Sequence, residues 1–127
     1  MGVAIIVKKI IYCTNIHSQR DAEHLIQNVK HINQMFDNPL IFVANNGRVD
    51  PYTLDLTSNV TVGQFKYQPS PQLGPVNSLL NALRMVAEMV PDAANYNVIF
   101  THADLYVRDR QLLESWLDRL ETADVVC

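Results

Sequence analysis

The sequence has few cysteines, which are common in secreted and metal-binding proteins, and few of the basic residues that are common in nucleic-acid-binding proteins. It contains two cysteines, and its ten Lys and Arg are outnumbered by thirteen Asp and Glu. Cys13 and Cys127 lie at opposite ends of the chain without the close spacing of paired metal ligands, so we expect reduced, structural thiols in a cytoplasmic protein. The basic residues are scattered and form no stripe, so nucleic acid is not an expected partner.

Long hydrophobic runs are also lacking. The strongly apolar stretch at residues 3–13 is interrupted by Lys8 and Lys9, is too short to cross a bilayer and is followed by no cleavage site, so we predict a strand and no membrane span. No internal repeat, low-complexity tract or linker divides the chain. With 48% apolar residues, the sequence predicts one domain over residues 1–127 with a core of its own.

The chain alternates between two hydrophobic periods. Apolar residues at steps of three and four predict helices at residues 19–36 and 75–90 and a third helix after Asp109, with Ser18 as the first N-cap and Trp116 on a buried stripe. Short apolar runs predict strands at residues 10–13, 40–44, 59–62, 97–101 and 123–127. This order predicts a three-layer α/β/α sandwich with a mostly parallel sheet and right-handed crossovers.

Three of the predicted strands are apolar on both faces. We therefore expect residues 10–13 in the interior of the sheet, flanked by residues 40–44 on one side and residues 97–101 on the other, all three covered by helices. The carboxyl ends of parallel strands share one edge, where α/β proteins bind ligands. Thr14, Asn45 or Asn46, and Asp104 are therefore expected along one rim, within reach of a single ligand.

His102 and Asp104 interrupt the apolar character directly after the fourth run. Polar groups at this place need a metal, a hydrogen-bond donor or a ligand to pair with. Asp104 is a candidate carboxylate ligand for Mg²⁺ or Mn²⁺, and His102 suits Mn²⁺ better than Mg²⁺. A second interpretation makes Asp104 the cap of a turn, His102 a locally hydrogen-bonded side chain, and the sequence Asn45-Asn46-Gly47 only a turn.

Three pieces of the sequence resemble the amino-terminal, nucleotide-sugar-binding half of a family-2-like GT-A glycosyltransferase. The first is residues 10–15 with the helix that follows, and the second is residues 40–47, ending in Val43-Ala44-Asn45-Asn46-Gly47. The third is Gln72-Leu73-Gly74-Pro75-Val76-Asn77, a helix, and then Phe100-Thr101-His102-Ala103-Asp104. This last piece is similar to the family's helix start and acidic motif, although His102 stands where the family usually has the first aspartate.

The resemblance implies a UDP- or GDP-sugar donor and a divalent metal, Mn²⁺ or Mg²⁺, that neutralises the diphosphate. It implies metal contacts from Asp104 and His102, and nucleotide contacts from Thr14, Asn15, Asn45, Asn46, Lys66, Gln72, Gly74 and Asn77. The chain ends where the family's acceptor half begins, so no catalytic base is assigned. We therefore expect binding without sugar transfer, and association as a homodimer that covers the sheet edge.

Two other functions remain open. In the first alternative, the chain is a non-catalytic glycosyltransferase-like interaction module that associates with itself or with a partner. In the second alternative, the chain is a metal-dependent α/β hydrolase that uses His102 and Asp104. A hydrolase would need further His or carboxylate ligands at other strand ends, whereas Asn45 and Asn46 are neutral amides, so the sequence favours nucleotide recognition.

Overall fold

The computed structural model describes residues 9–65, 74–102, 105, 109–120 and 122, with the backbone alone for residues 74–78. This part of the chain contains four strands and three α-helices. In chain order they are β1 (Lys9–Ile16), α1 (Gln19–Met35), β2 (Leu40–Asn45), β3 (Val60–Gln64), α2 (Gly74–Met89), β4 (Tyr96–Phe100) and α3 (Arg110–Arg119), with 3₁₀ turns at Pro51–Thr53 and Ala93–Asn95.

The four strands form one parallel sheet in the order β3-β2-β1-β4. β1 pairs with β2 from Ile11 opposite Leu40, and with β4 from Lys9 opposite Tyr96. The prediction that β1 lies between the second and fourth apolar runs is therefore confirmed. The side chains of β1 from Ile10 to Thr14 are buried, as the apolar pattern predicts for a strand covered on both faces.

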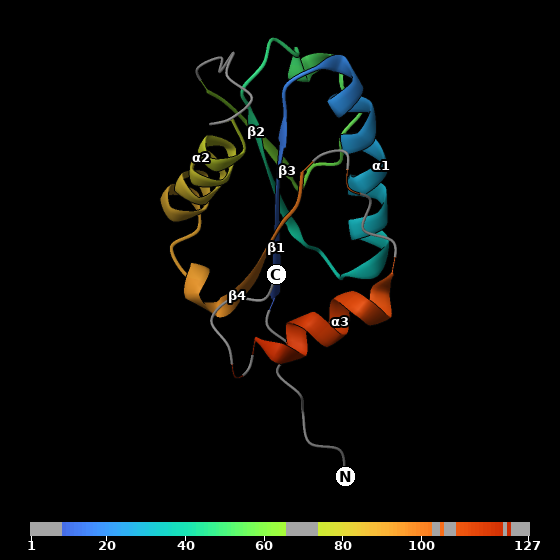
Figure 1. Cartoon of the computed structure of the whole chain (residues 1–127), viewed down its shortest axis with the longest axis vertical. Coiled ribbons are helices and arrows are strands. Elements are labelled where there is room, and N and C mark those ends of the chain that lie inside the picture. Colours follow the sequence, from blue (N-terminus) through green and yellow to red (C-terminus); the bar gives the residue numbers. More distant parts are fainter. Residues whose placement is uncertain (1–8, 66–73, 103–104, 106–108, 121, 123–127) are drawn as a thin grey trace.

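Helices α1 and α2 cover opposite faces of the sheet (Figure 1). Alternate residues of the strands point to alternate faces, so Tyr12 packs with the α1 residues Leu25 and Ile32, whereas Cys13 packs with Ala82 and Val86 of α2. The α/β class, the parallel sheet and the helices on both faces agree with the sequence-based prediction.

Helix α1 begins where its sequence predicts. The Ser18 side chain accepts a hydrogen bond from the Asp21 amide, and the Asp21 carboxylate accepts hydrogen bonds from the amides of His17 and Ser18. This capping box satisfies backbone donors that the first turn leaves without intrahelical partners. The chain leaves the helix through Asn38, which has a positive φ of 49°, a conformation that asparagine tolerates better than most residues.

The interior position expected for the fourth strand is not found in the described part of the sheet. There β4 has a strand neighbour on one side only, and Val98 exposes 37% of its surface. The apolar pattern predicted cover on both faces, but it carried no information about the hydrogen-bonding partner on the outer side. The strand predicted at residues 123–127 lies outside the described residues.

Helix α3 is less buried than its sequence pattern predicts. Its N-cap is Asp109, whose carboxylate accepts a hydrogen bond from the Leu112 amide. Leu113 is buried, but Leu112 and Trp116 are 48% and 39% exposed, so the prediction of a buried Trp116 is wrong. No helix in the described ranges is long and apolar enough to cross a membrane.

Candidate functional site

The carboxyl ends of the strands form one continuous edge. The Asn46 amide donates to the Ile16 carbonyl at 3.1 Å, the Phe65 amide to the Asn45 carbonyl at 2.9 Å, and the Thr101 amide to the Cys13 carbonyl at 3.1 Å. From β1 the chain proceeds to β2 and β3 on one side, then returns to place β4 on the other side. The topological switch point therefore lies between the ends of β1 and β4, where open α/β sheets bind ligands.

Two of the predicted nucleotide-binding residues, Thr14 and Asn15, lie near the carboxyl end of the central strand β1. Thr14 is fully buried, whereas Asn15 is half-buried. The exposed His17 and Ser18 follow and lead into α1. At the end of β1, Asn15, His17 and Ser18 are therefore more accessible to a ligand than Thr14 and Ile16, which are fully buried.

Asn45 and Asn46 are buried at the end of β2 and bind neighbouring parts of the protein. The Asn45 amide nitrogen donates to the Val49 carbonyl at 2.6 Å, and its oxygen accepts from the Gly47 amide at 3.1 Å. The Asn46 oxygen accepts from the Asn81 amide nitrogen of α2 at 3.2 Å. Within the structure, these side chains hold the loop after β2, which agrees with the interpretation of this sequence as a turn; nucleotide contact by either remains a prediction.

Gly47 lets the loops after β1 and β2 touch. A Cβ atom on Gly47 would overlap the His17 carbonyl oxygen and lie 2.5 Å from the His17 carbonyl carbon. The Gln64 amide nitrogen donates to the Gly47 carbonyl at 3.1 Å from the end of β3. A residue without a side chain is therefore required for this edge to form as it does.

The end of β4 is tied to β1 by side chains as well as by the backbone. The Tyr12 and Thr101 hydroxyl groups form a buried hydrogen bond. Burial raises the pKa of Tyr12 above its usual value, and the hydrogen bond with Thr101 acts in the opposite direction. His102 follows as an exposed side chain whose ring meets the Phe100 ring edge to face, with 5.7 Å between the ring centroids.

Helix α1 also contacts the connection that follows β4. The amide nitrogen of Asn28, which is fully buried, donates to the Leu105 carbonyl at 3.0 Å. The Leu105 amide donates in turn to the His102 carbonyl at 3.1 Å. Asn28 belongs to no sequence motif. Its one local indication is its place between Leu25 and Ile32 on the apolar face of α1.

The predicted metal site is only partly within the described residues. His102 lies at the carboxyl edge, but Asp104 is outside the described ranges. Among the described residues, no three or more His, Cys, Asp or Glu side chains are grouped closely enough to hold a metal ion. His102 alone does not make a metal site, so Mn²⁺ or Mg²⁺ binding depends on Asp104 and remains a prediction.

The remaining predicted contacts belong to the start of α2 and the segment before it. The helix begins at Gly74, and because it connects the end of β3 with the start of β4, its first turn lies at the carboxyl edge. Asn77 is in that first turn. The amino end of a helix favours anionic groups. Lys66 and Gln72 lie outside the described residues.

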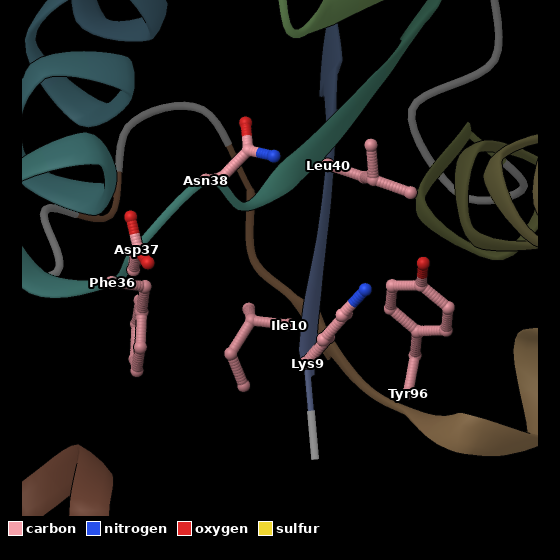
Figure 2. Close-up of a pocket in the computed structure, with 7 residues that line it drawn as sticks. All are labelled: Lys9, Ile10, Phe36, Asp37, Asn38, Leu40 and Tyr96. Carbon is pink, nitrogen blue, oxygen red and sulfur yellow. The ribbon is translucent and has the colours of Figure 1, made fainter. Parts of the chain in front are cut away.

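A cavity of about 470 Å³ lies at the opposite edge of the sheet (Figure 2). Its lining comes from the amino ends of β1, β2 and β4 and from the turn after α1: Lys9, Ile10, Phe36, Asp37, Asn38, Leu40 and Tyr96. Of the predicted site residues whose side chains the structure describes, none lines this cavity. The cavity and the switch point therefore lie at opposite ends of the strands.

Comparison with known proteins identifies no relative: no family model, curated protein or solved structure matches the chain.

Proposed function

We propose that this chain is a glycosyltransferase-like protein that binds a nucleotide-sugar donor, a UDP- or GDP-sugar, at the carboxyl edge of its sheet. The observation that carries the proposal is the switch point between β1 and β4 in an all-parallel sheet. Where the strand order of a parallel sheet reverses, a crevice opens at the carboxyl ends of the two adjacent strands, and nucleotides commonly bind there.

The polar groups around this crevice suit a nucleotide. Asn15 is half-buried at this edge with its side-chain oxygen buried, and it carries an amide, a group that matches the edge of a base. His102 is exposed at the end of β4, and in the proposed complex its ring would donate a hydrogen bond to a ribose or phosphate oxygen. Arg20 and Arg48 lie on segments at the same edge and add positive charge to it.

The two helices that begin at this edge differ in their capacity for an anion. In α1 the Asp21 carboxylate occupies the amides of His17 and Ser18, so a second anion there would be repelled. Helix α2 has no acidic residue in its first turn. The diphosphate is therefore assigned to the Gly74 end of α2, and a divalent metal held by Asp104 and His102 would neutralise its charge when bound.

The test is a calorimetric and thermal-unfolding titration of the purified chain with UDP-, GDP- and CDP-sugars, with and without Mn²⁺. A ligand at 100 times its dissociation constant stabilises the native state by about 2.7 kcal/mol. We expect one nucleotide class to stabilise the protein. No stabilisation by any class at millimolar concentration would overturn the proposal.

A matched pair of histidine variants locates the site. His102→Ala should weaken binding because it removes a side chain at the switch point. His31→Ala should not, because residue 31 lies near the other end of α1, roughly 18 Å from its start at 1.5 Å per residue. Equal effects of the two substitutions would place the ligand elsewhere.

A second candidate function is self-association as an interaction module. The observation in its favour is β4, which has one strand neighbour in the described sheet and carries the exposed Val98. An exposed strand edge offers unpaired backbone groups to another chain. A homodimer in light scattering, weakened by Val98→Lys but not by Thr53→Lys on the exposed 3₁₀ turn, would support it, and a monomer at high concentration would exclude it.

A further inference from the structure

Asn28 is a buried polar residue on a helix face that is otherwise apolar. It lies three residues after Leu25 and four before Ile32, and all three side chains are fully buried. Leucine at this position would continue the stripe. A buried amide costs free energy unless it is hydrogen-bonded, so its use in the core requires a specific partner.

That partner lies 77 residues further along the chain, in the connection that follows β4. The Asn28 amide nitrogen donates to the Leu105 carbonyl, and the Leu105 amide donates to the His102 carbonyl. Asn28 is thus joined to the backbone of His102 through two hydrogen bonds of 3.0 and 3.1 Å.

The same connection is held from the central strand. Thr101, directly before His102, binds Cys13 through its amide and Tyr12 through its hydroxyl group. The strand therefore fixes the beginning of the connection, whereas Asn28 fixes it four residues later. Two anchors on opposite sides of His102 restrict its backbone more than either alone.

We propose that Asn28 is a positioning residue for the nucleotide site, an inference that rests on the proposed function. Through the hydrogen bond to Leu105 and the bond from Leu105 to His102, it holds His102 at the switch point without touching the ligand. A leucine of similar volume would fill the same space in the core, and because Leu105 is exposed, water can replace the Asn28 amide as the partner of the Leu105 carbonyl. The amide is needed for the geometry of the connection.

The test compares Asn28→Leu with Val29→Ala in the full chain. Asn28→Leu keeps the volume of the core and removes the donor to Leu105. Val29→Ala removes buried methyl groups from the adjacent position of α1, where the side chain has no hydrogen-bonding atom. We expect Asn28→Leu to lower nucleotide-sugar affinity in the presence of Mn²⁺ roughly tenfold or more, as the loss of groups that orient metal ligands does. Val29→Ala should lower the unfolding temperature more and the affinity less.

Amide hydrogen exchange gives a local readout without ligand. In Asn28→Leu the Leu105 amide should exchange at least several-fold faster, while the amides of Phe42 and Val43 in β2 keep their protection. Unchanged exchange at Leu105, or an affinity loss no greater than that of Val29→Ala, would overturn the inference alone. Absence of nucleotide-sugar binding by the unsubstituted chain would overturn the proposed function, and this inference with it.

Discussion

Replacing Gly47 by alanine should break the contact between the loops after β1 and β2. The added Cβ would overlap the His17 carbonyl oxygen and lie 2.5 and 2.7 Å from the His17 carbonyl carbon and Cα. These are backbone atoms, and the Asn46–Ile16 hydrogen bond of 3.1 Å keeps the two loops together. The clash is therefore relieved only by separating the loops.

The size of the effect follows from the distances. Carbon atoms pack favourably at about 3.5–4.0 Å, so the two segments must move apart by roughly 1 Å or more. Overpacking costs about 1–3 kcal/mol where side chains adjust, and more where they cannot. We expect Gly47→Ala to destabilise the protein by at least about 3 kcal/mol, a large fraction of the 5–15 kcal/mol that stabilises a typical domain.

Gly63→Ala is the matched control. A Cβ there would meet the Sδ and Cε atoms of Met85 at 2.8 and 2.9 Å and the Phe65 ring at 3.0 Å. Methionine is flexible and adapts its conformation, and alanine loses less backbone entropy in a strand than glycine. The net change expected for Gly63→Ala is therefore within about 1 kcal/mol of zero.

The assay is urea unfolding followed by circular dichroism, with the free energy of unfolding extrapolated to water for each variant. The expected result is a loss at Gly47→Ala that exceeds the loss at Gly63→Ala by about 2 kcal/mol or more. Equal losses, or a Gly47→Ala variant as stable as the original, would refute the close packing of the two loops.

Two further predictions concern buried polar groups. Asn45→Ala removes the partners of the Val49 carbonyl and the Gly47 amide, so unfolding in urea should show a loss of about 2–4 kcal/mol at an unchanged m-value; a loss below about 0.5 kcal/mol would contradict the two hydrogen bonds. Burial raises the pKa of the Cys13 thiol to about 12. The thiol of the unfolded chain ionises at a lower pH than the buried thiol. The contribution of Cys13 to stability is therefore fully present below about pH 8.5 and is lost as pH rises toward 12. The decline in the free energy of unfolding over this pH range should be shallower in Cys13→Ala.

Local sequence patterns predicted the elements well where the determining residues are neighbours. Ser18 and Asp21 stand three residues apart, so the start of α1 is visible in the sequence, and the helix begins at the predicted Gln19. The apolar runs of β1 and β2 likewise predicted their central places. The position of β4 was not fully predictable, because an apolar pattern reports on the faces of a strand and not on its outer hydrogen-bonding edge.

The candidate site was predictable in position but not in detail. The edge that gathers Asn15, Asn46 and His102 follows from parallel strands. That Asn45 binds its own loop depends on the path of the chain to Val49. The role of Asn28 depends on Leu105, a partner too distant in sequence for any local pattern to reveal.

The central claim is tested most directly by a titration of the ¹⁵N-labelled chain with a UDP-sugar and a GDP-sugar, followed by amide chemical shifts. The account predicts saturable shifts at the ends of β1 and β4, at Asn15 and His102, and in the first turn of α2 at Asn77. Shifts confined to Lys9 and Tyr96 around the cavity at the opposite edge, or no shifts at millimolar ligand, would contradict it.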